Sequence, residues 1–152
     1  MKIGCIQMNM GFGKVEQNYE RAEALIRQAA EQGAEIIVLP EMWNSGYALE
    51  QLDELADVHG ERTQAFLSAL SKELGVHIVG GSVSTKEEDG FYNTMYTYNK
   101  DGEKVGTYNK AHLFRLMDEH LHLQAGSDMN RFQLGDIEAA GVICYDIRFP
   151  EW

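Results

Sequence analysis

The feature that most constrains the fold is a short, almost wholly apolar segment, Glu35–Leu39, which follows an amphipathic stretch ending at Gly33. A run of this length and composition is typical of a strand that other layers cover on both faces. Apolar residues spaced three and four apart between Ala22 and Ala29 predict a helix, with Gly33 just beyond its C-terminal end. Because Lys2–Met8 reads as an earlier strand, these elements together predict a βαβ unit.

A second amphipathic stretch, from about Thr63 to Leu74, predicts another helix, which Gly75 closes. We expect this helix to lead into a strand from Val76 to Ser84. The adjacent glycines of that strand, Gly80 and Gly81, predict a close approach of another backbone segment.

The second half of the chain predicts antiparallel strands. Side chains alternate from Phe91 to Asn99, and a polar turn then leads into Lys104–Asn109, which is typical of a hairpin. A polar segment, Lys110–Asn130, precedes two further expected strands, Arg131–Leu134 and Ala140–Cys144. The elements together predict an α/β fold with helices packed on a mixed sheet.

Composition limits the class of partner and the compartment. No linker or repeat divides residues 1–152, so we expect one domain. The net charge of −11 disfavours nucleic acid and anionic lipid as partners. Neither a signal-peptide pattern nor an apolar run of membrane-spanning length is present. Cys5 and Cys144 lie far apart in apolar stretches, which predicts a buried Cys5 and a reducing, cytoplasmic location.

Three polar residues lie where predicted strands end and loops begin, the positions at which α/β folds build their sites. Glu41 follows the buried strand and can act as a base there. Cys144 stands at an expected strand-to-helix turn, a setting that favours a thiolate. Lys110 ends the hairpin and can bring a positive charge to an oxyanion. Taken singly, each also fits an ordinary structural role, as a surface carboxylate, a core cysteine or a solubilising lysine.

The segments around these residues resemble the three signature segments of the nitrilase, or carbon-nitrogen hydrolase, superfamily. They are Leu39-Pro40-Glu41-Met42-Trp43, Tyr108-Asn109-Lys110-Ala111-His112-Leu113 and Cys144-Tyr145-Asp146-Ile147-Arg148-Phe149-Pro150-Glu151. The resemblance covers the whole chain and is closest to the ω-amidase branch, of the methionine-salvage type. It implies an α-β-β-α sandwich with mixed sheets. Members of that superfamily continue well past the nucleophile segment, so this chain is expected to be the N-terminal portion, with a fold incomplete at the C-terminus.

The resemblance also implies catalytic roles. Glu41 would be the general base, Lys110 the oxyanion stabiliser and Cys144 the nucleophile. Glu119 matches a further glutamate that orients the substrate or the lysine in this superfamily. The implied reaction is hydrolysis of a small linear amide, an ω-amide of a 2-oxo dicarboxylic acid, through a cysteine thioester with release of ammonia and no metal or organic cofactor.

Other implications concern binding and assembly. The Tyr145 backbone N–H would join the lysine at the oxyanion, and Arg148 would either bind an acidic substrate or form a structural ion pair. A homo-oligomer, a dimer or larger, is expected. Two alternatives stay open: a catalytically silent interaction module of the same fold and, more distantly, a metal-dependent hydrolase using His112, His120 and His122, whose spacing does not match a helical zinc site.

Overall fold

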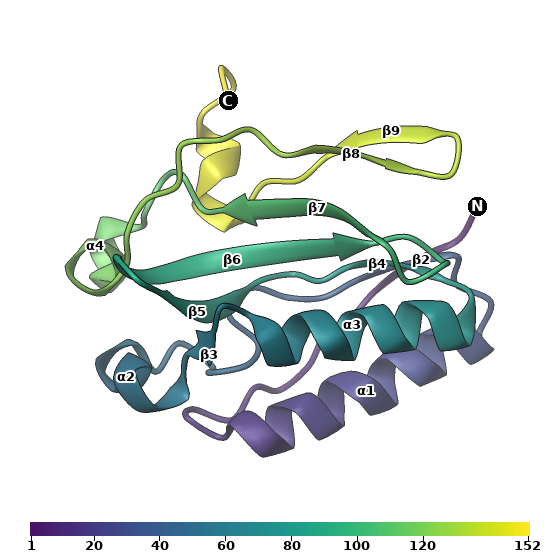
Figure 1. Cartoon of the computed structure of the whole chain (residues 1–152), viewed down its shortest axis with the longest axis horizontal. Helices are drawn as coiled ribbons and strands as arrows, with labels where there is room; N and C mark the ends of the chain where they lie inside the picture. The colour runs from purple at the N-terminus through teal and green to yellow at the C-terminus, as the bar shows by residue number, and fades with distance from the viewer.

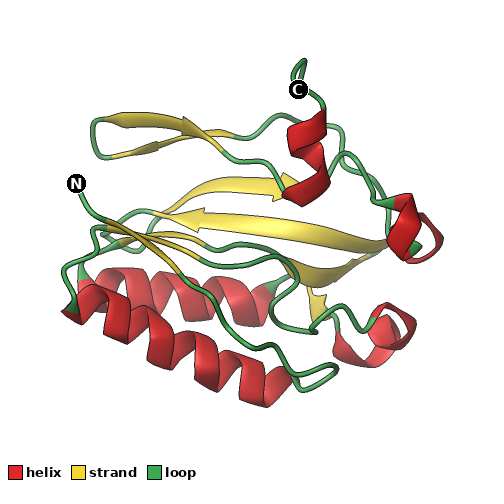
Figure 2. Cartoon of the chain, turned by 180° about the vertical axis from the view of Figure 1, so that it is seen from behind, coloured by secondary structure: helices red, strands yellow, loops and turns green.

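The computed structural model describes residues 1–152, which are arranged in three layers (Figure 1). Two long helices, α1 (Val15–Glu31) and α3 (Glu61–Leu74), cover one face of a seven-stranded sheet. A separate two-stranded sheet of β8 (Arg131–Leu134) and β9 (Ile137–Ala140) lies over the opposite face (Figure 2). The expected α/β class with mixed sheets is confirmed, and the layers present correspond to α-β-β of the expected sandwich.

The large sheet is mixed. Its strands are β1 (Ile3–Cys5), β2 (Ile36–Val38), β3 (Asp57–Val58), β4 (His77–Val79), β5 (Val83–Glu87), β6 (Gly90–Tyr98) and β7 (Lys104–Asn109). Strands β1, β2 and β4 are parallel neighbours, whereas β6 runs antiparallel to β4, β5 and β7. Since α1 connects the parallel strands β1 and β2, the predicted βαβ unit is confirmed.

Short helical turns occupy the loops of the fold. They are η1 (Leu49–Gln51), α2 (Leu52–Leu55), η2 (Arg115–Met117), α4 (Glu119–His122) and η3 (Cys144–Arg148). Of these, α4 and η3 carry residues with predicted catalytic roles. The polar segment between β7 and β8 contains η2 and α4 and is not wholly irregular.

The predicted strand from Val76 to Ser84 is interrupted in its middle. Strands β4 and β5 pair with the same edge of β6, on either side of a break at residues 80–82. Gly81 has a φ of +59°, and a Cβ there would clash with the carbonyl oxygen of Pro40. The predicted close backbone approach is therefore confirmed, and the segment it meets is the one that leads into Glu41.

The main core fills the space between the helices and the sheet. It includes the fully buried Trp43, and the tyrosines Tyr96 and Tyr98 of β6 point into it. Met95 points to the other face of the same strand, where it packs with Tyr108 and Ile143. The predicted alternation along β6 is confirmed, and this strand contributes side chains to both layers.

Two predictions about the C-terminal strands are wrong in detail. Strand β8 has the predicted bounds, but its partner β9 ends at Ala140, where the predicted strand begins. The reason is a tight turn at residues 135–136, after which Leu134 pairs with Ile137. The first residue of β8, Arg131, then pairs with Ala140, so β9 ends there. Cys144 consequently begins η3 instead of ending a strand, and no helix begins near Phe149.

The prediction of a buried Cys5 is also wrong. Strand β1 lies at the edge of the sheet, and its Gly4 faces α1 through Ala29. Cys5 therefore lies on the opposite face with Ile3, and both side chains are exposed. Both cysteines are free thiols. Neither α1 nor any other helix combines the length and apolarity needed to cross a bilayer.

Candidate active site

Glu41 lies in a tight turn that follows β2 and rests against the break between β4 and β5. The Ser82 N–H donates to the Pro40 carbonyl at 3.0 Å, and the Ser82 hydroxyl accepts from the Met42 N–H at 3.0 Å. Trp43 then anchors the turn in the main core. Because the backbone is bound on both sides of Glu41, the position of its carboxylate is set by the sheet.

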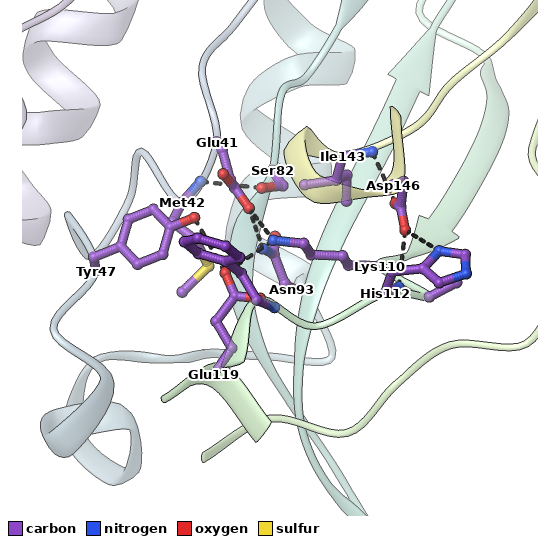
Figure 3. Close-up of polar contacts among 12 residues, drawn as sticks. Glu41, Met42, Tyr47, Ser82, Asn93, Lys110, His112, Glu119, Ile143 and Asp146 are labelled. Atoms are coloured by element: carbon purple, nitrogen blue, oxygen red, sulfur yellow. Dashed lines mark hydrogen bonds and ion pairs between the residues drawn. The ribbon is translucent and has the colours of Figure 1, made fainter. Parts of the chain in front are cut away.

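Lys110 directly follows β7, and its side chain is fully buried. Its N–H donates to the Asn93 carbonyl at 2.9 Å, and its carbonyl accepts from the Gly126 N–H at 2.9 Å. The ammonium Nζ lies 2.7 Å from Glu41 Oε1 and 2.8 Å from Glu119 Oε1 (Figure 3). The topology thus brings together three of the predicted site residues around one buried cation.

The charge of Lys110 is maintained by its two acidic partners. Burial alone lowers the pKa of a lysine, but hydrogen bonds to Glu119 and Glu41, with their negative charges, outweigh it and raise the pKa of Lys110 above its ordinary value. A lysine in this state is a fixed cation and a hydrogen-bond donor. It cannot serve as a base at neutral pH.

Glu119 is the first residue of α4 and is fully buried. Its Oε2 accepts a hydrogen bond from the Phe114 N–H at 2.8 Å, and its Oε1 accepts one from the Tyr47 hydroxyl at 3.3 Å as well as the contact from Lys110. Glu119 is therefore placed to hold Lys110.

Cys144 is the exposed first residue of η3 and has a φ of +47°. This left-handed conformation costs a non-glycine residue about 1 kcal/mol, so the surrounding structure must hold it. Burial and the neighbouring Glu41 carboxylate raise the pKa of the Cys144 thiol, and Lys110 offsets them only partly. This direction favours a neutral thiol over the expected thiolate. A carboxylate next to a neutral thiol is placed to act as its base.

A buried carboxylate, Asp146, holds the turn that carries Cys144. Its Oδ2 accepts from the Tyr108 hydroxyl at 2.8 Å and from the Ile143 N–H at 3.0 Å. Its Oδ1 accepts from the backbone N–H of His112 at 2.8 Å and also contacts the ring Nδ1 at 2.8 Å (Figure 3). Asp146 thus ties the turn that carries Cys144 to the end of β7, close to Lys110 in the sequence.

The structure places the other two predicted binding residues at the surface side of η3. The Tyr145 ring packs against Phe114 and Phe149, with centroid separations of 5.0 and 5.4 Å. Arg148 is exposed and forms no ion pair with another residue of 1–152, and its two expected roles stay predictions.

The three histidines of the metal alternative do not converge. His112 contacts Asp146 and stacks on Phe149 at 3.7 Å between ring centroids, whereas His120 is exposed on α4. No group of three His, Cys, Asp or Glu side chains is placed to hold a metal ion.

Two residues that the sequence reasoning missed also contact the charged cluster. Tyr47, with a φ of +66°, donates to Glu119, and burial with the nearby Glu41 and Glu119 charges raises its pKa, so it stays a neutral donor. Asn93 donates from Nδ2 to Glu41 Oε1 at 2.9 Å. For Asn93, the sequence offered one indication of a site: a polar residue on the same face of β6 as the buried Met95.

Comparison with known proteins gives a consistent picture. The family model described as carbon-nitrogen hydrolase matches residues 2–152. The chain is 48% identical over 150 residues to the 2-oxoglutaramate amidase of Bacillus subtilis, covering 99% of this chain and 58% of that protein. It is 34% identical over 158 residues to human omega-amidase NIT2, covering 99% of this chain and 56% of that protein.

A solved structure extends the likeness to three dimensions. A carbon-nitrogen hydrolase superfamily protein from Xanthomonas campestris matches with a TM-score of 0.89 and 30% identity, covering 98% of this chain and 55% of the other. The chain thus spans between 55% and 58% of the length of these relatives.

Proposed function

The chain belongs to the carbon-nitrogen hydrolase family, and from that premise we propose that the protein hydrolyses small linear amides with Glu41, Lys110 and Cys144 as catalytic residues. One observation carries the proposal: a buried ammonium bridges two carboxylates, one of which adjoins the thiol. This arrangement supplies a base, a fixed positive charge and a nucleophile within one site.

In the first half of the reaction, Glu41 takes the proton of the Cys144 thiol as the sulfur attacks the amide carbonyl carbon. The carbonyl π electrons move onto oxygen, and the Lys110 ammonium with the Tyr145 N–H stabilises the resulting oxyanion. When the tetrahedral intermediate collapses, the C–N bond breaks and Glu41 returns the proton to the leaving nitrogen. Ammonia and a thioester on Cys144 are formed.

In the second half, water replaces the thiol as the nucleophile. Glu41 accepts a proton from the water molecule while the water oxygen attacks the thioester carbonyl carbon. The Lys110 ammonium and the Tyr145 N–H stabilise the second oxyanion. The C–S bond then breaks, the proton returns to sulfur, and the carboxylic acid leaves. Because Lys110 keeps its charge throughout, only Glu41 shuttles protons.

We propose an ω-amide of a 2-oxo dicarboxylic acid as the substrate. The 48% identity to a protein named 2-oxoglutaramate amidase supports this choice. Such a substrate carries a carboxylate remote from the amide, and Arg148, exposed and without an ion-pair partner, is available to bind it.

The test is an ammonia-release assay with 2-oxoglutaramate, 2-oxosuccinamate, glutamine, asparagine and a simple nitrile. We expect the 2-oxo amides to be the best substrates. Cys144→Ala should abolish release, whereas the matched Cys5→Ala should leave it nearly unchanged, since only Cys144 lies beside Glu41. Equal losses in both variants, or no release from any amide, would contradict the proposal.

We also propose that residues 1–152 belong to one carbon-nitrogen hydrolase domain and that the protein assembles as a homo-oligomer in the cytoplasm. Large exposed apolar side chains on the site-bearing turns, Leu116, Leu121 and Ile147, support an assembly that covers them. Sedimentation velocity of the protein tests this, and a monomer at micromolar concentration would refute it. The two free thiols support a reducing compartment, which cell fractionation would check.

A further inference from the structure

We propose that Asn93 is a positioning residue for Glu41: its side-chain N–H holds one carboxylate oxygen, so that the other oxygen is left to exchange protons with Cys144. The inference rests on the proposed function, because it assigns Asn93 a task within the same site. That task is to set the orientation of the Glu41 carboxylate.

The geometry separates the two oxygens of Glu41. Asn93 Nδ2 donates to Oε1 at 2.9 Å, and Lys110 Nζ contacts the same Oε1 at 2.7 Å (Figure 3). Neither donor reaches Oε2. Two donors from different strand segments that meet on one oxygen fix the plane of a carboxylate, and they leave the second oxygen as the stronger proton acceptor.

The side-chain hydrogen bonding of Asn93 is one-sided, and its donor end is directed at Glu41. Asn93 is fully buried, yet its Oδ1 has no hydrogen-bond partner. Turning the amide over would set Oδ1 against the Glu41 carboxylate, acceptor against acceptor, so the observed orientation is the one that serves Glu41. A buried acceptor without a partner costs free energy, and in Asn93 this cost accompanies a donor end that binds Glu41.

A buried structural asparagine in the same chain shows the contrast. Asn44 uses both ends of its amide on one residue: Nδ2 donates to the Ser84 carbonyl at 3.2 Å, and Oδ1 accepts from the Ser84 N–H at 2.9 Å. Asn93 uses only its donor end. Its backbone carbonyl also accepts from the Lys110 N–H, so Asn93 locates the base and the oxyanion partner together.

The test compares Asn93→Leu with Thr97→Val. Thr97 lies on the same face of β6, is fully buried and also has an unpartnered polar atom, but it has no contact with Glu41. We expect Asn93→Leu to lower kcat/KM roughly 10-fold to 100-fold, the scale of one hydrogen bond to a charged group, mainly through kcat. The Tm should not fall, because an unpaired buried acceptor is removed. Thr97→Val should leave the kinetics unchanged.

A second readout follows the protonation of Glu41 without any substrate. A carboxylate that loses a donor holds its proton more tightly, so both the acid limb of kcat/KM and the infrared titration of Glu41 should move to higher pH in Asn93→Leu. Glu41→Gln identifies the infrared band. The groups facing Glu41 (Lys110, Glu119, Tyr47 and Cys144) are the same in wild type and variant, so they do not create the difference.

Each outcome decides the matter. Unchanged kinetics with an unshifted titration, or a large fall in the Tm of Asn93→Leu, would overturn the role of Asn93. If the wild type releases no ammonia from any amide but the titration shifts, the proposed function fails and the positioning of Glu41 by Asn93 stands.

Discussion

The two sides of the site are held in different ways. On the side of the base, Glu41, Lys110 and Glu119 form a cluster built into the sheet, with Lys110 and Glu119 fully buried. On the side of the nucleophile, the exposed Cys144 begins a short turn that Asp146 ties to the sheet. We therefore expect damage to the fully buried Lys110 and Glu119 to affect fold and chemistry together, whereas damage to the less buried Glu41 or to the Cys144 turn should affect chemistry first.

Lys110→Met should have the largest effect, because it removes both the buried positive charge that stabilises the cluster and the proposed oxyanion donor. Removing one partner of a buried charge cluster should lower the free energy of unfolding by about 3 to 5 kcal/mol and remove most amide hydrolysis. Urea denaturation and ammonia release measure the two losses. Lys104→Met, at the exposed lysine that begins β7, is the control. A stable but inactive Lys110→Met would break the proposed link between fold and chemistry.

Glu41→Gln should leave the fold nearly intact, since Glu41 is the more exposed carboxylate of the cluster, and should slow the reaction roughly 100-fold or more. Both thioester formation and thioester hydrolysis should slow, because the same carboxylate serves both. Rapid-quench measurement of the first turnover, set against steady-state release, separates the two steps. Fast ammonia release by this variant would make Glu41 a structural residue.

Asp146→Asn probes the nucleophile side. The amide cannot accept from all the donors that Asp146 binds, so the turn should shift and kcat should fall roughly 10-fold. The charge cluster should keep its structure, and the free energy of unfolding should fall by only about 1 to 3 kcal/mol. Asp136→Asn, in the exposed turn of the β8–β9 hairpin, is the matched control. A loss of stability as large as that of Lys110→Met would erase the distinction between the sides.

The smallest effect concerns the ionisation of Cys144 itself. Its thiol pKa lies above the ordinary value, so the proton is held more tightly and the thiolate fraction at neutral pH is lowered. The rate of alkylation by iodoacetamide should therefore still be rising between about pH 8 and 10. In Glu41→Gln the curve should move to lower pH, because the carboxylate charge is gone while Lys110 remains. A plateau below pH 8 in the wild type would restore the thiolate prediction.

The sequence was most informative where backbone periodicity or signature segments decided the outcome. The βαβ unit, the α3 helix and the β6–β7 hairpin follow from spacing that tertiary contacts reinforce. Glu41 and Lys110 could be predicted because strand ends and signature segments coincide near them, whereas Cys144 was predicted from its signature segment and an expected strand end that the structure does not have. The sequence could not show that the Lys110 ammonium contacts Glu41 or that Glu41 lies beside the Cys144 thiol; the structure shows both.

Other features had no local signal. The exposure of Cys5 depends on β1 being an edge strand, a property of sheet order and not of composition. The raised pKa of the Cys144 thiol depends on Glu41, far away in the sequence. Asn93 gains its importance from a contact spanning 52 positions of the chain, which no periodicity reports.

The clamp on Lys110 has a stereochemical consequence. An ammonium has three N–H bonds, and Glu41 and Glu119 take two of them. One N–H remains, and the two carboxylates that bind the ammonium hold the direction in which it points. A carbonyl oxygen that accepts from this N–H is held along one line, so the substrate carbon would meet sulfur from a restricted range of directions.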